Sequence, residues 1–387
     1  MLAALLTLII TDMKKFYFAL LAVSASLTSC AGDQGVQLLP EENFATEVDG
    51  KPVGLYTLSN GDLTMQVTNY GARVVSLWTP DRKGRMEDVV LGYDNIDRYV
   101  NNTGERFLGA CVGPYANRLA GGKIEIDGAT YSLPKNNNGQ TLHGGLMGVD
   151  RVVWDVIAAD STSIFLRYVH PDRQDGYPGN IVIAMKYELT PDNEFVVTYR
   201  ASTDAPTYVN LSHHPFFNLK GEGKGTILDH VMTINASRTT PVDKYLIPVG
   251  GYADVTGTPF DFREPHTIGE RINEENEQLA NGGGYDHNWV LDRKTTSGIE
   301  SAATVYEPSS GRFLEVLTDQ PGLQFYSGNF FDGKSTGKYG RPLRYRESLA
   351  LETQKFPDSP HHPEFPSTRL NPGEMYTHVC IYRFSAK

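Results

Sequence analysis

The run Ile181-Val182-Ile183-Ala184-Met185-Lys186-Tyr187-Glu188-Leu189 carries an apolar side chain at every second position. Successive side chains of a β-strand point to opposite faces, so this period of two predicts a strand with one buried face. Similar runs recur along the chain, separated by clusters of Gly, Pro, Asn and Asp, at 63–67, 124–126, 195–199, 313–317 and 379–384. This pattern is typical of an antiparallel all-β protein.

Helical periodicity is scarce. One short helix is predicted over Thr267 to Leu279, with Thr267 as its cap, Ile268 and Ile272 facing inward, and Gly282-Gly283-Gly284 after its end. Many strands, 38 glycines and 21 tyrosines favour a large antiparallel β-sandwich with few short helices. A concave sheet face of such a sandwich can hold a polar ligand against aromatic walls.

Composition and charge limit the class of protein. The chain has 387 residues, 40% hydrophobic and 21% charged, which is ordinary for a folded domain. Its formal charge of -11 disfavours binding to nucleic acid or to an anionic membrane surface, because neither would gain Coulomb attraction. We find no internal repeat and no compositional break after the amino-terminal region. We therefore expect one domain over residues 51–387, preceded by a flexible tether over residues 30–50.

The first thirty residues have the composition of an export signal. Two apolar stretches flank Asp12-Met13-Lys14-Lys15, and neither can span a bilayer as a helix. Lys14-Lys15 and the apolar stretch after it match a signal peptide, and Leu27-Thr28-Ser29-Cys30 resembles a bacterial lipoprotein processing site. We expect Met13 to be the true start and residues 1–29 to be removed. A lipid on Cys30 would then tether an exported, periplasmic domain to the membrane.

Two cysteines are left in the chain after Cys30. Cys111 and Cys380 are too few for a disulfide framework or a metal cluster. Buried free thiols are the default expectation for them. A single bridge between the two is the alternative in an oxidising periplasm.

Two adjacent imidazoles, His213 and His214, lie in the otherwise apolar, strand-like run Asn210 to Leu219. A titratable side chain is costly to bury without a partner, so the pair indicates chemistry. Histidine holds and releases a proton near neutral pH, which suits a general acid. Glu352 follows the short apolar run Leu349-Ala350-Leu351 and is the candidate for a partner base.

Five segments place a polar or charged residue among glycine, aromatic or apolar neighbours that would otherwise belong to a core. They are Gly113 to Leu119, Gln140 to Gly145, Asn210 to Leu219, Gly284 to Trp289 and Leu351 to Gln354. In this order they resemble the aldose 1-epimerase family, also called galactose mutarotases. The resemblance runs from about Tyr56 to the carboxyl terminus. Each motif alone is weak, whereas the five in order are specific.

The resemblance implies a β-supersandwich enzyme that interconverts the α and β anomers of free aldohexoses such as galactose or glucose, without cofactor or metal. It also implies that the histidine of the Asn-Leu-Ser-His-His run donates a proton and that Glu352 accepts one. The chemistry agrees, because opening a pyranose ring removes the proton of the anomeric hydroxyl while the ring oxygen gains one. For this we expect Glu352 to be partly desolvated and the acidic histidine to be held cationic by a nearby negative charge.

The family run usually has Asn-His where this chain has His213-His214. Alignment on Phe217-Asn218-Leu219 selects His214 as the general acid. Neighbouring side chains of a strand point to opposite faces, so His213 is expected to face away from the sugar and to be structural.

The other matched segments resemble sugar-binding positions. Arg118 and Asn117 offer a guanidinium and an amide, His143 an imidazole, and Asp286 a carboxylate that can accept from two hydroxyls. Gln324 matches a polar contact of the family, and Phe325 or Tyr326 is expected to pack on the apolar face of the ring.

Three other functions compete with this interpretation. Asp286 and Glu352 could be the acid and base of a glycoside hydrolase, although the matched donor is an imidazole. A non-catalytic glycan-binding lipoprotein would keep the concave surface alone. A hexose-phosphate epimerase is disfavoured because a phosphate site usually needs clustered Arg or Lys, and Arg118 is the one Arg or Lys within the five segments. His361-His362, in a Pro-rich loop without a nearby third ligand, are expected to be solvated and not to bind metal.

Overall fold

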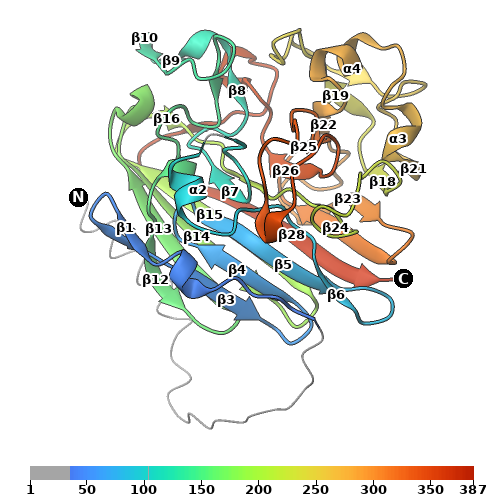
Figure 1. Cartoon of the computed structure of the whole chain (residues 1–387). Helices are drawn as coiled ribbons and strands as arrows, with labels where there is room; N and C mark the ends of the chain where they lie inside the picture. The colour runs from blue at the N-terminus through green and yellow to red at the C-terminus, as the bar shows by residue number, and fades with distance from the viewer. Residues whose placement is uncertain (1–34, 103) are drawn as a thin grey trace. The chain divides into compact units, whose positions relative to one another are not determined.

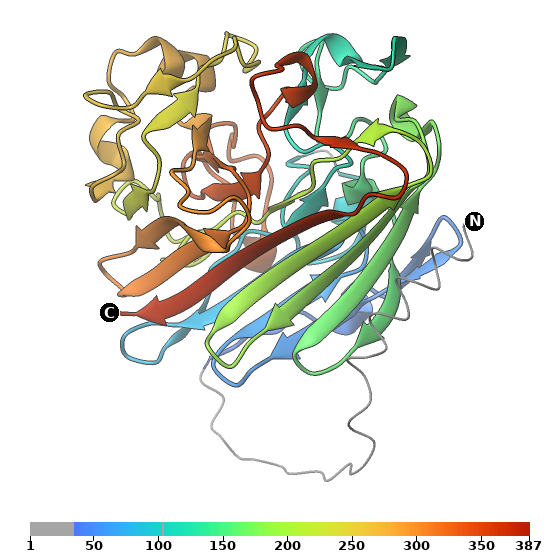
Figure 2. The same ribbon diagram turned by 180° about the vertical axis from the view of Figure 1, so that it is seen from behind.

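The strand predicted at 181–189 lies inside a nine-stranded antiparallel sheet of the computed structural model, which describes residues 35–102 and 104–387. This strand, β14 (Ile181–Leu189), pairs with β13 (Ser163–His170) and β15 (Glu194–Thr203). Its apolar side chains at alternate positions are buried, which confirms the predicted period of two. On one side, β12 (Asp155–Ala159) lies beside β13 at the edge of the sheet. On the other side, the strands beyond β15 are, in order, β28 (Tyr376–Ala386), β24 (Arg312–Thr318), β23 (Glu300–Tyr306), β18 (Val231–Ile234) and β21 (His266–Thr267). Figure 2 shows the carboxyl-terminal strand β28 running through the interior of this sheet.

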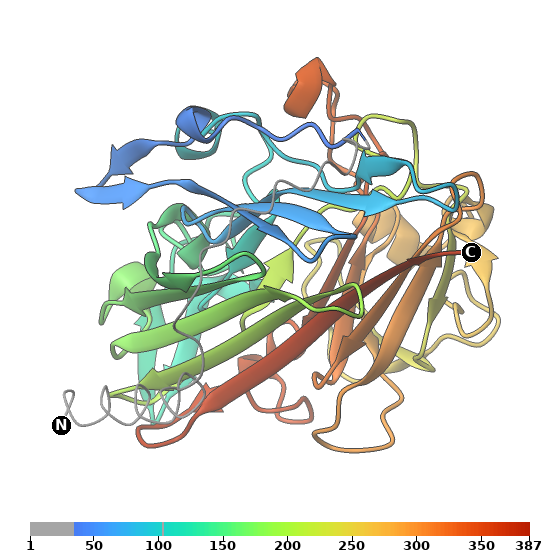
Figure 3. The ribbon, with the colours of Figure 1, turned by 90° about the horizontal axis from the view of Figure 1, so that it is seen from below.

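A second, four-stranded sheet lies against the first (Figures 1 and 3). Its strands are β3 (Leu55–Ser59), β4 (Thr64–Thr68), β5 (Arg73–Pro80) and β6 (Met86–Asp88). Apolar side chains of the two sheets, such as Met65 and Val67 on one and Met185 on the other, belong to a single buried cluster. This apolar layer is the core of the predicted β-sandwich, because each sheet buries its apolar face against the other.

A third sheet has five strands and carries most of the chemically interesting residues. It consists of β20 (Ala253–Asp254), β19 (Arg238–Thr240), β22 (Asp286–Val290), β25 (Gly322–Tyr326) and β26 (Ala350–Gln354). Two-stranded ribbons complete the described strands: β1 (Thr46–Val48) with β2 (Lys51–Val53), β7 (Ala110–Val112) with β17 (Ser212–His214), β8 (Arg118–Leu119) with β11 (Thr141–Leu142), β9 (Lys123–Ile126) with β10 (Ala129–Ser132), and β16 (Thr207–Tyr208) with β27 (Arg369–Leu370).

The helices of the described residues are short. The α-helices are α2 (Asp97–Val100), α3 (Ile268–Arg271) and α4 (Glu277–Gly282). The 3-10 helices are η1 (Glu41–Asn43), η2 (Ala120–Gly122), η3 (Val149–Arg151), η4 (Gln174–Gly176), η5 (Lys338–Gly340) and η6 (Ser359–His361). None of the helices in the described part of the chain is long and apolar enough to cross a membrane.

The single helix predicted over Thr267 to Leu279 is wrong, because the segment forms α3 and α4 with a break between them. Asn276 has an extended backbone, and its side chain accepts hydrogen bonds from the backbone N–H groups of Gln278 and Leu279. Such a cap starts a new helix in place of continuing the old one. Ile268 and Ile272 are buried, as predicted.

The predicted tether is shorter than expected. Residues 1–34, with the signal peptide and Cys30, lie outside the described residues. Residues Gly35–Lys387 form one compact unit. Phe44 is fully buried, and the backbone N–H and C=O of Leu39 are hydrogen-bonded to the side chain of Gln66. Leu39 and Phe44 therefore anchor this part of the chain to the folded domain, whereas most of residues 45–50 are exposed.

Cys111 and Cys380 are buried free thiols, so the alternative of a disulfide between them is not formed. Burial raises the pKa of both thiols, that of Cys380 to about 12, and makes thiolate formation unfavourable. His361 and His362 were expected to be solvated, but both are half-buried. Both rings contact the buried carboxylate of Asp358, at 2.5 Å for His361 and 3.5 Å for His362.

Candidate active site

Three neighbouring strands of the five-stranded sheet present polar side chains on one face. The register places Gln324 of β25 opposite Glu352 of β26, and Asp286 of β22 opposite Tyr326. Residues two apart on a strand share a face, so all four side chains lie on the same side of the sheet. Gln324 Nε2 donates to Asp286 Oδ1 over 2.7 Å. Phe325, between Gln324 and Tyr326, points the other way and is packed among core aromatics.

The paired histidines lie on β17, which contacts β26 and pairs with β7. His214 points toward β26, and its Nε2 lies 3.3 Å from Glu352 Oε1. His213 points to the opposite side, against the rings of Tyr187 and Phe195 in the core. Its Nε2 lies 3.1 Å from the carbonyl oxygen of Gly109. The strand geometry thus separates the two imidazoles as predicted from the sequence.

Asn117 and His143 position each other through reciprocal hydrogen bonds. His143 N–H donates to Asn117 C=O, and Asn117 N–H donates to His143 Nδ1, both over 3.0 Å. A nitrogen that accepts from an N–H group carries no proton, so the proton of the neutral imidazole is on Nε2. Gly144, with φ +90°, allows the turn here because a Cβ would overlap Gly113 O. The next residue after Asn117, Arg118, directs its Nη1 to within 3.9 Å of Asp286 Oδ2.

These side chains line one cavity of about 180 Å³, which has room for about six water molecules or one monosaccharide ring. Six of the seven predicted catalytic and binding residues are on its wall: Asn117, Arg118, His143, His214, Asp286 and Glu352. Gln324 is not among the lining residues, and its amide donates to the carboxylate of Asp286. Of the two candidates for ring packing, Tyr326 lines the cavity and Phe325 does not.

Several lining residues were not identified from the sequence: Glu105, Phe107, Asn137, Leu142, Phe216 and Phe330. Phe216 could have been found, since it lies two residues after His214 and its ring centroid is 4.6 Å from that imidazole. Phe107 packs on His143, with ring centroids 4.6 Å apart. Glu105 and Phe107 belong to an irregular loop, where no periodicity indicates which side chain turns inward.

Burial controls the protonation of His214 and Glu352. Burial lowers the pKa of the His214 imidazole to about 3, and the charge of Arg73 acts in the same direction. Burial also raises the pKa of Glu352 well above its usual value; Asp286 adds to this shift and Arg118 opposes it. Glu352 is thus desolvated, as predicted. The prediction of a cationic His214 is wrong for the ligand-free site, because desolvation outweighs any neighbouring negative charge.

A metal ion is a conceivable ligand of the same residues. One ligand atom each from His143, His214 and Glu352 all lie within 4.8 Å of one another. However, Asn117 N–H occupies the Nδ1 lone pair of His143, and the neutral ring then carries a proton on its other nitrogen. A metal ion at Nε2 would have to displace the last proton of a neutral imidazole and leave an imidazolate, which is unfavourable near neutral pH. This tautomer makes His143 a hydrogen-bond donor to the cavity rather than a metal ligand.

A titratable acid–base pair on the wall of a cavity the size of one sugar ring defines an enzyme that moves protons on a single small polar molecule. The aldose 1-epimerase family model matches residues 54–383. A galactose mutarotase from Bos taurus is 41% identical over 330 residues, which cover 85% of this chain and 93% of that protein. An aldose 1-epimerase from Escherichia coli strain K12 is 36% identical over 349 residues, covering 89% and 99%.

Solved structures agree with the sequence comparison. An aldose epimerase homologue from C. elegans has a TM-score of 0.79 at 28% identity, over 86% of this chain and 99% of its own. A galactose 1-epimerase from Lactobacillus acidophilus has a TM-score of 0.77 at 28% identity, over 89% and 97%. The chain belongs to the aldose 1-epimerase family and is an isomerase of that class.

His213→Phe is expected to change the sign of its effect on stability between neutral and acidic pH. At pH 7 the variant loses the hydrogen bond to Gly109, which costs about 1 kcal/mol. Burial holds the pKa of His213 at about 3 in the folded chain. The unfolded chain binds this proton near pH 6.5, so wild type loses about 2 to 3 kcal/mol on acidification to pH 4.5 and the phenylalanine variant does not.

Urea unfolding of both proteins at pH 7 and pH 4.5 measures this crossover. We expect the variant to be the less stable protein at pH 7 and the more stable one at pH 4.5. An equal loss of stability at both pH values would show that His213 is not neutral in the fold.

Proposed function

We propose that the chain interconverts the α and β anomers of free aldohexoses, with His214 as the general acid and Glu352 as the general base. The observation that carries this proposal is the contact of 3.3 Å between His214 Nε2 and Glu352 Oε1 on the wall of the cavity. At this separation, His214 and Glu352 can contact the two reacting oxygens of one sugar. The two reacting oxygens of a pyranose, the anomeric hydroxyl and the ring oxygen, are bonded to the same carbon.

Ring opening and ring closure each move two protons, one through Glu352 and one through His214. Glu352 takes the proton of the anomeric hydroxyl while His214 gives one to the ring oxygen, and the bond between C1 and the ring oxygen breaks. The products are the open-chain aldehyde, a neutral His214 and a protonated Glu352. Rotation about the C1–C2 bond exposes the other face of the aldehyde. The ring oxygen then attacks that face, both proton transfers reverse, and the opposite anomer forms.

The protonation of the ligand-free pair matches the open-chain stage of this cycle. At that stage Glu352 carries the proton and His214 is neutral, and burial favours these same forms because it disfavours both charged forms. Moving that proton from Glu352 to His214 gives the cationic histidine and the carboxylate that open a closed ring. The total number of protons on the two residues does not change. The anomeric hydroxyl assists this transfer by donating a hydrogen bond to the carboxylate of Glu352.

The other lining residues bind the sugar. Asp286 has one oxygen fixed by Gln324 and the other near Arg118, so it is a hydrogen-bond acceptor held in place for sugar hydroxyls. These partners oppose the rise that burial causes in the pKa of Asp286. The matched proton donor is the His214 imidazole, whereas a hydrolase of this kind protonates the leaving group with a carboxylic acid, which disfavours that alternative. His143 donates from Nε2, and Tyr326 covers the apolar face of the ring.

Polarimetry of freshly dissolved α-galactose and α-glucose tests the function. Galactose is the first choice because several relatives of this chain are named galactose mutarotases. We expect the purified chain to speed the approach to the equilibrium rotation for at least one of the two sugars. Release of reducing sugar from oligosaccharides without this effect would indicate a hydrolase. Sugar binding without any effect on rate would indicate a glycan-binding protein.

The amino terminus supports a second proposal, on location. The charged and apolar stretches before Leu27-Thr28-Ser29-Cys30 favour an exported, periplasmic lipoprotein that is anchored only by lipid on Cys30. The Cys30→Ala variant is therefore expected to move from the membrane fraction to the soluble fraction. Mass spectrometry of the wild-type amino terminus should find a modified Cys30 as the first residue. A Cys30→Ala protein that stays in the membrane fraction would contradict the anchor.

A further inference from the structure

Glu105 is a carboxylate on the wall of the active-site cavity that the reaction described above does not use. Its Oε1 accepts a hydrogen bond from Phe107 N–H over 2.9 Å, and this is the carboxylate's one hydrogen bond among the described residues. The adjacent residue, Phe107, packs on the His143 ring and lines the same cavity. Glu105 thus lines the cavity with one carboxylate oxygen to which no described residue donates.

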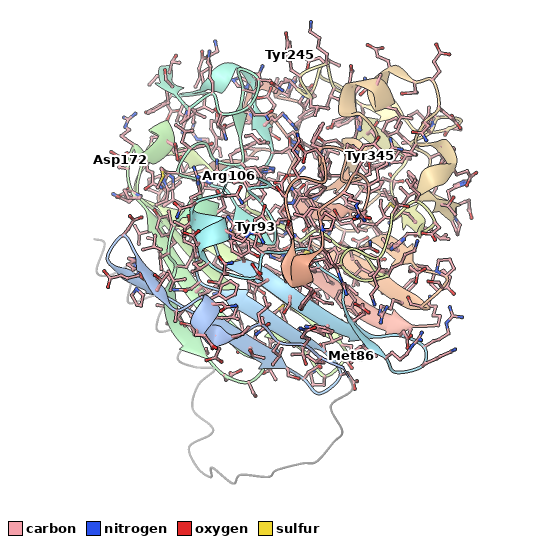
Figure 4. The ribbon with its side chains drawn as sticks, in the orientation of Figure 1. Met86, Tyr93, Arg106, Asp172, Tyr245 and Tyr345 are labelled. Carbon is pink, nitrogen blue, oxygen red and sulfur yellow. The ribbon has the colours of Figure 1, made fainter. Side chains whose placement is uncertain are left out.

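The loop that carries Glu105 is fixed by charged and polar contacts on both sides. Arg106 makes a two-point contact with the buried carboxylate of Asp150, through Nε to Oδ2 and Nη2 to Oδ1, both over 2.8 Å. The carbonyl of Arg106 accepts from Arg73 Nη1 over 2.9 Å. The carbonyl of Glu105 accepts from Tyr93 OH over 3.2 Å. Figure 4 marks Arg106 and Tyr93 close together in the centre of the view. A side chain on such a loop keeps its direction, as a specific binding contact requires.

The nearby cations do not neutralise this carboxylate by direct contact. The donors of Arg73 and Arg106 described above are directed to Asp150 and to backbone carbonyls. Arg118, the guanidinium on the cavity wall, lies near Asp286. Burial raises the pKa of Glu105, whereas the N–H groups of Phe107 and Arg106 and the charges of Arg73 and Arg106 oppose that rise and favour the carboxylate. In its ionised form Glu105 only accepts hydrogen bonds, so a sugar has to present a donor to it.

We infer that Glu105 is a specificity-determining residue that binds one hydroxyl of the sugar and requires a hydrogen-bond donor at that place. This rests on the proposed function and adds the substrate class to it. A neutral aldose, or an amino sugar with an ammonium group there, meets the requirement. An aldose with a carboxylate or a phosphate at that place is rejected, because two acceptors of like charge would face each other.

The inference is tested with Glu105→Ala and with the monodeoxy analogues of galactose. Loss of a hydrogen bond to a charged group is expected to lower kcat/KM of the variant for galactose by about 10- to 100-fold, mainly through KM. One deoxy analogue should show a similar loss with the wild-type enzyme. With Glu105→Ala that same analogue should show little further loss, because the two changes remove one interaction.

Glu105→Gln separates charge from folding. Its amide oxygen can keep the hydrogen bond to Phe107, while the variant loses the negative charge. We expect this variant to raise KM for galactose. The ratio of kcat/KM for galactose to kcat/KM for a galactose derivative that carries an anionic group in place of the recognised hydroxyl should fall by about tenfold. The matched control is Glu41→Gln, which makes the same change on the surface and should behave as wild type.

Calorimetric binding of galactose provides a readout that does not depend on turnover. A Kd that rises at least tenfold in Glu105→Ala supports the inference even if the wild type is inactive, and inactivity would overturn the proposed function alone. If Glu105→Ala weakened the binding of galactose and of every monodeoxy analogue by the same factor, the inference would be overturned and a structural role of Glu105 would be indicated. An unchanged Kd together with an unchanged KM would overturn it as well.

Discussion

Replacing Glu352 with glutamine is expected to lower kcat for galactose mutarotation by about 10²- to 10⁴-fold, the usual contribution of a positioned base. The amide is nearly isosteric with the carboxyl group but cannot take the proton of the anomeric hydroxyl. KM should change little, because the sugar keeps its contacts with the other lining residues. Polarimetric progress curves at several galactose concentrations measure both constants.

The folded state should tolerate this change. Burial already drives Glu352 toward its neutral form, so a neutral amide at the same place should keep or raise Tm. Glu41→Gln on the surface is the matched control and should retain wild-type kcat. A Glu352→Gln enzyme with kcat within twofold of wild type would exclude Glu352 as the base.

Replacing His214 with asparagine is expected to have an effect of similar size, about 10²- to 10⁴-fold on kcat. Asparagine can still donate a hydrogen bond toward Glu352, but it does not titrate and cannot protonate the ring oxygen. The smaller variant His214→Ala leaves space beside Glu352, and added imidazole should restore part of its rate. A purely structural role of His214 would not produce this rescue.

His213→Phe is the matched comparison, because it alters the neighbouring imidazole on the opposite face of β17. It should keep kcat close to wild type at pH 7. Loss of turnover in His213→Phe with normal turnover in His214→Asn would reverse the assignment of the two histidines.

The class of fold was predictable because burial of one sheet face imposes a period of two on the sequence. The alternation at 181–189 therefore identified β14. The same strand rule separated His213 from His214 without coordinates. The break between α3 and α4 was missed, because the cap at Asn276 competes locally with a helical pattern that continues past it.

Protonation within the site was not predictable from residue types. Histidine and glutamate have ordinary pKa values near 6.5 and 4.5, and the shifts at His214 and Glu352 come from desolvation that no sequence pattern reports. In the same way, Gln324 carries the expected residue type, yet its amide contacts Asp286 in place of the cavity.

The sequence by itself determined the alternating strands, the identity of the acid and base candidates, and the family, since these depend on local periodicity and on motifs in a given order. Only the tertiary structure decided that residues 352 and 214, distant in the chain, touch, that burial favours the neutral form of both, and that Glu105 lines the same cavity. The physical reason is that contact and burial depend on how strands and loops pack together. A residue in an irregular loop acquires its direction from partners such as Asp150, which are distant in sequence.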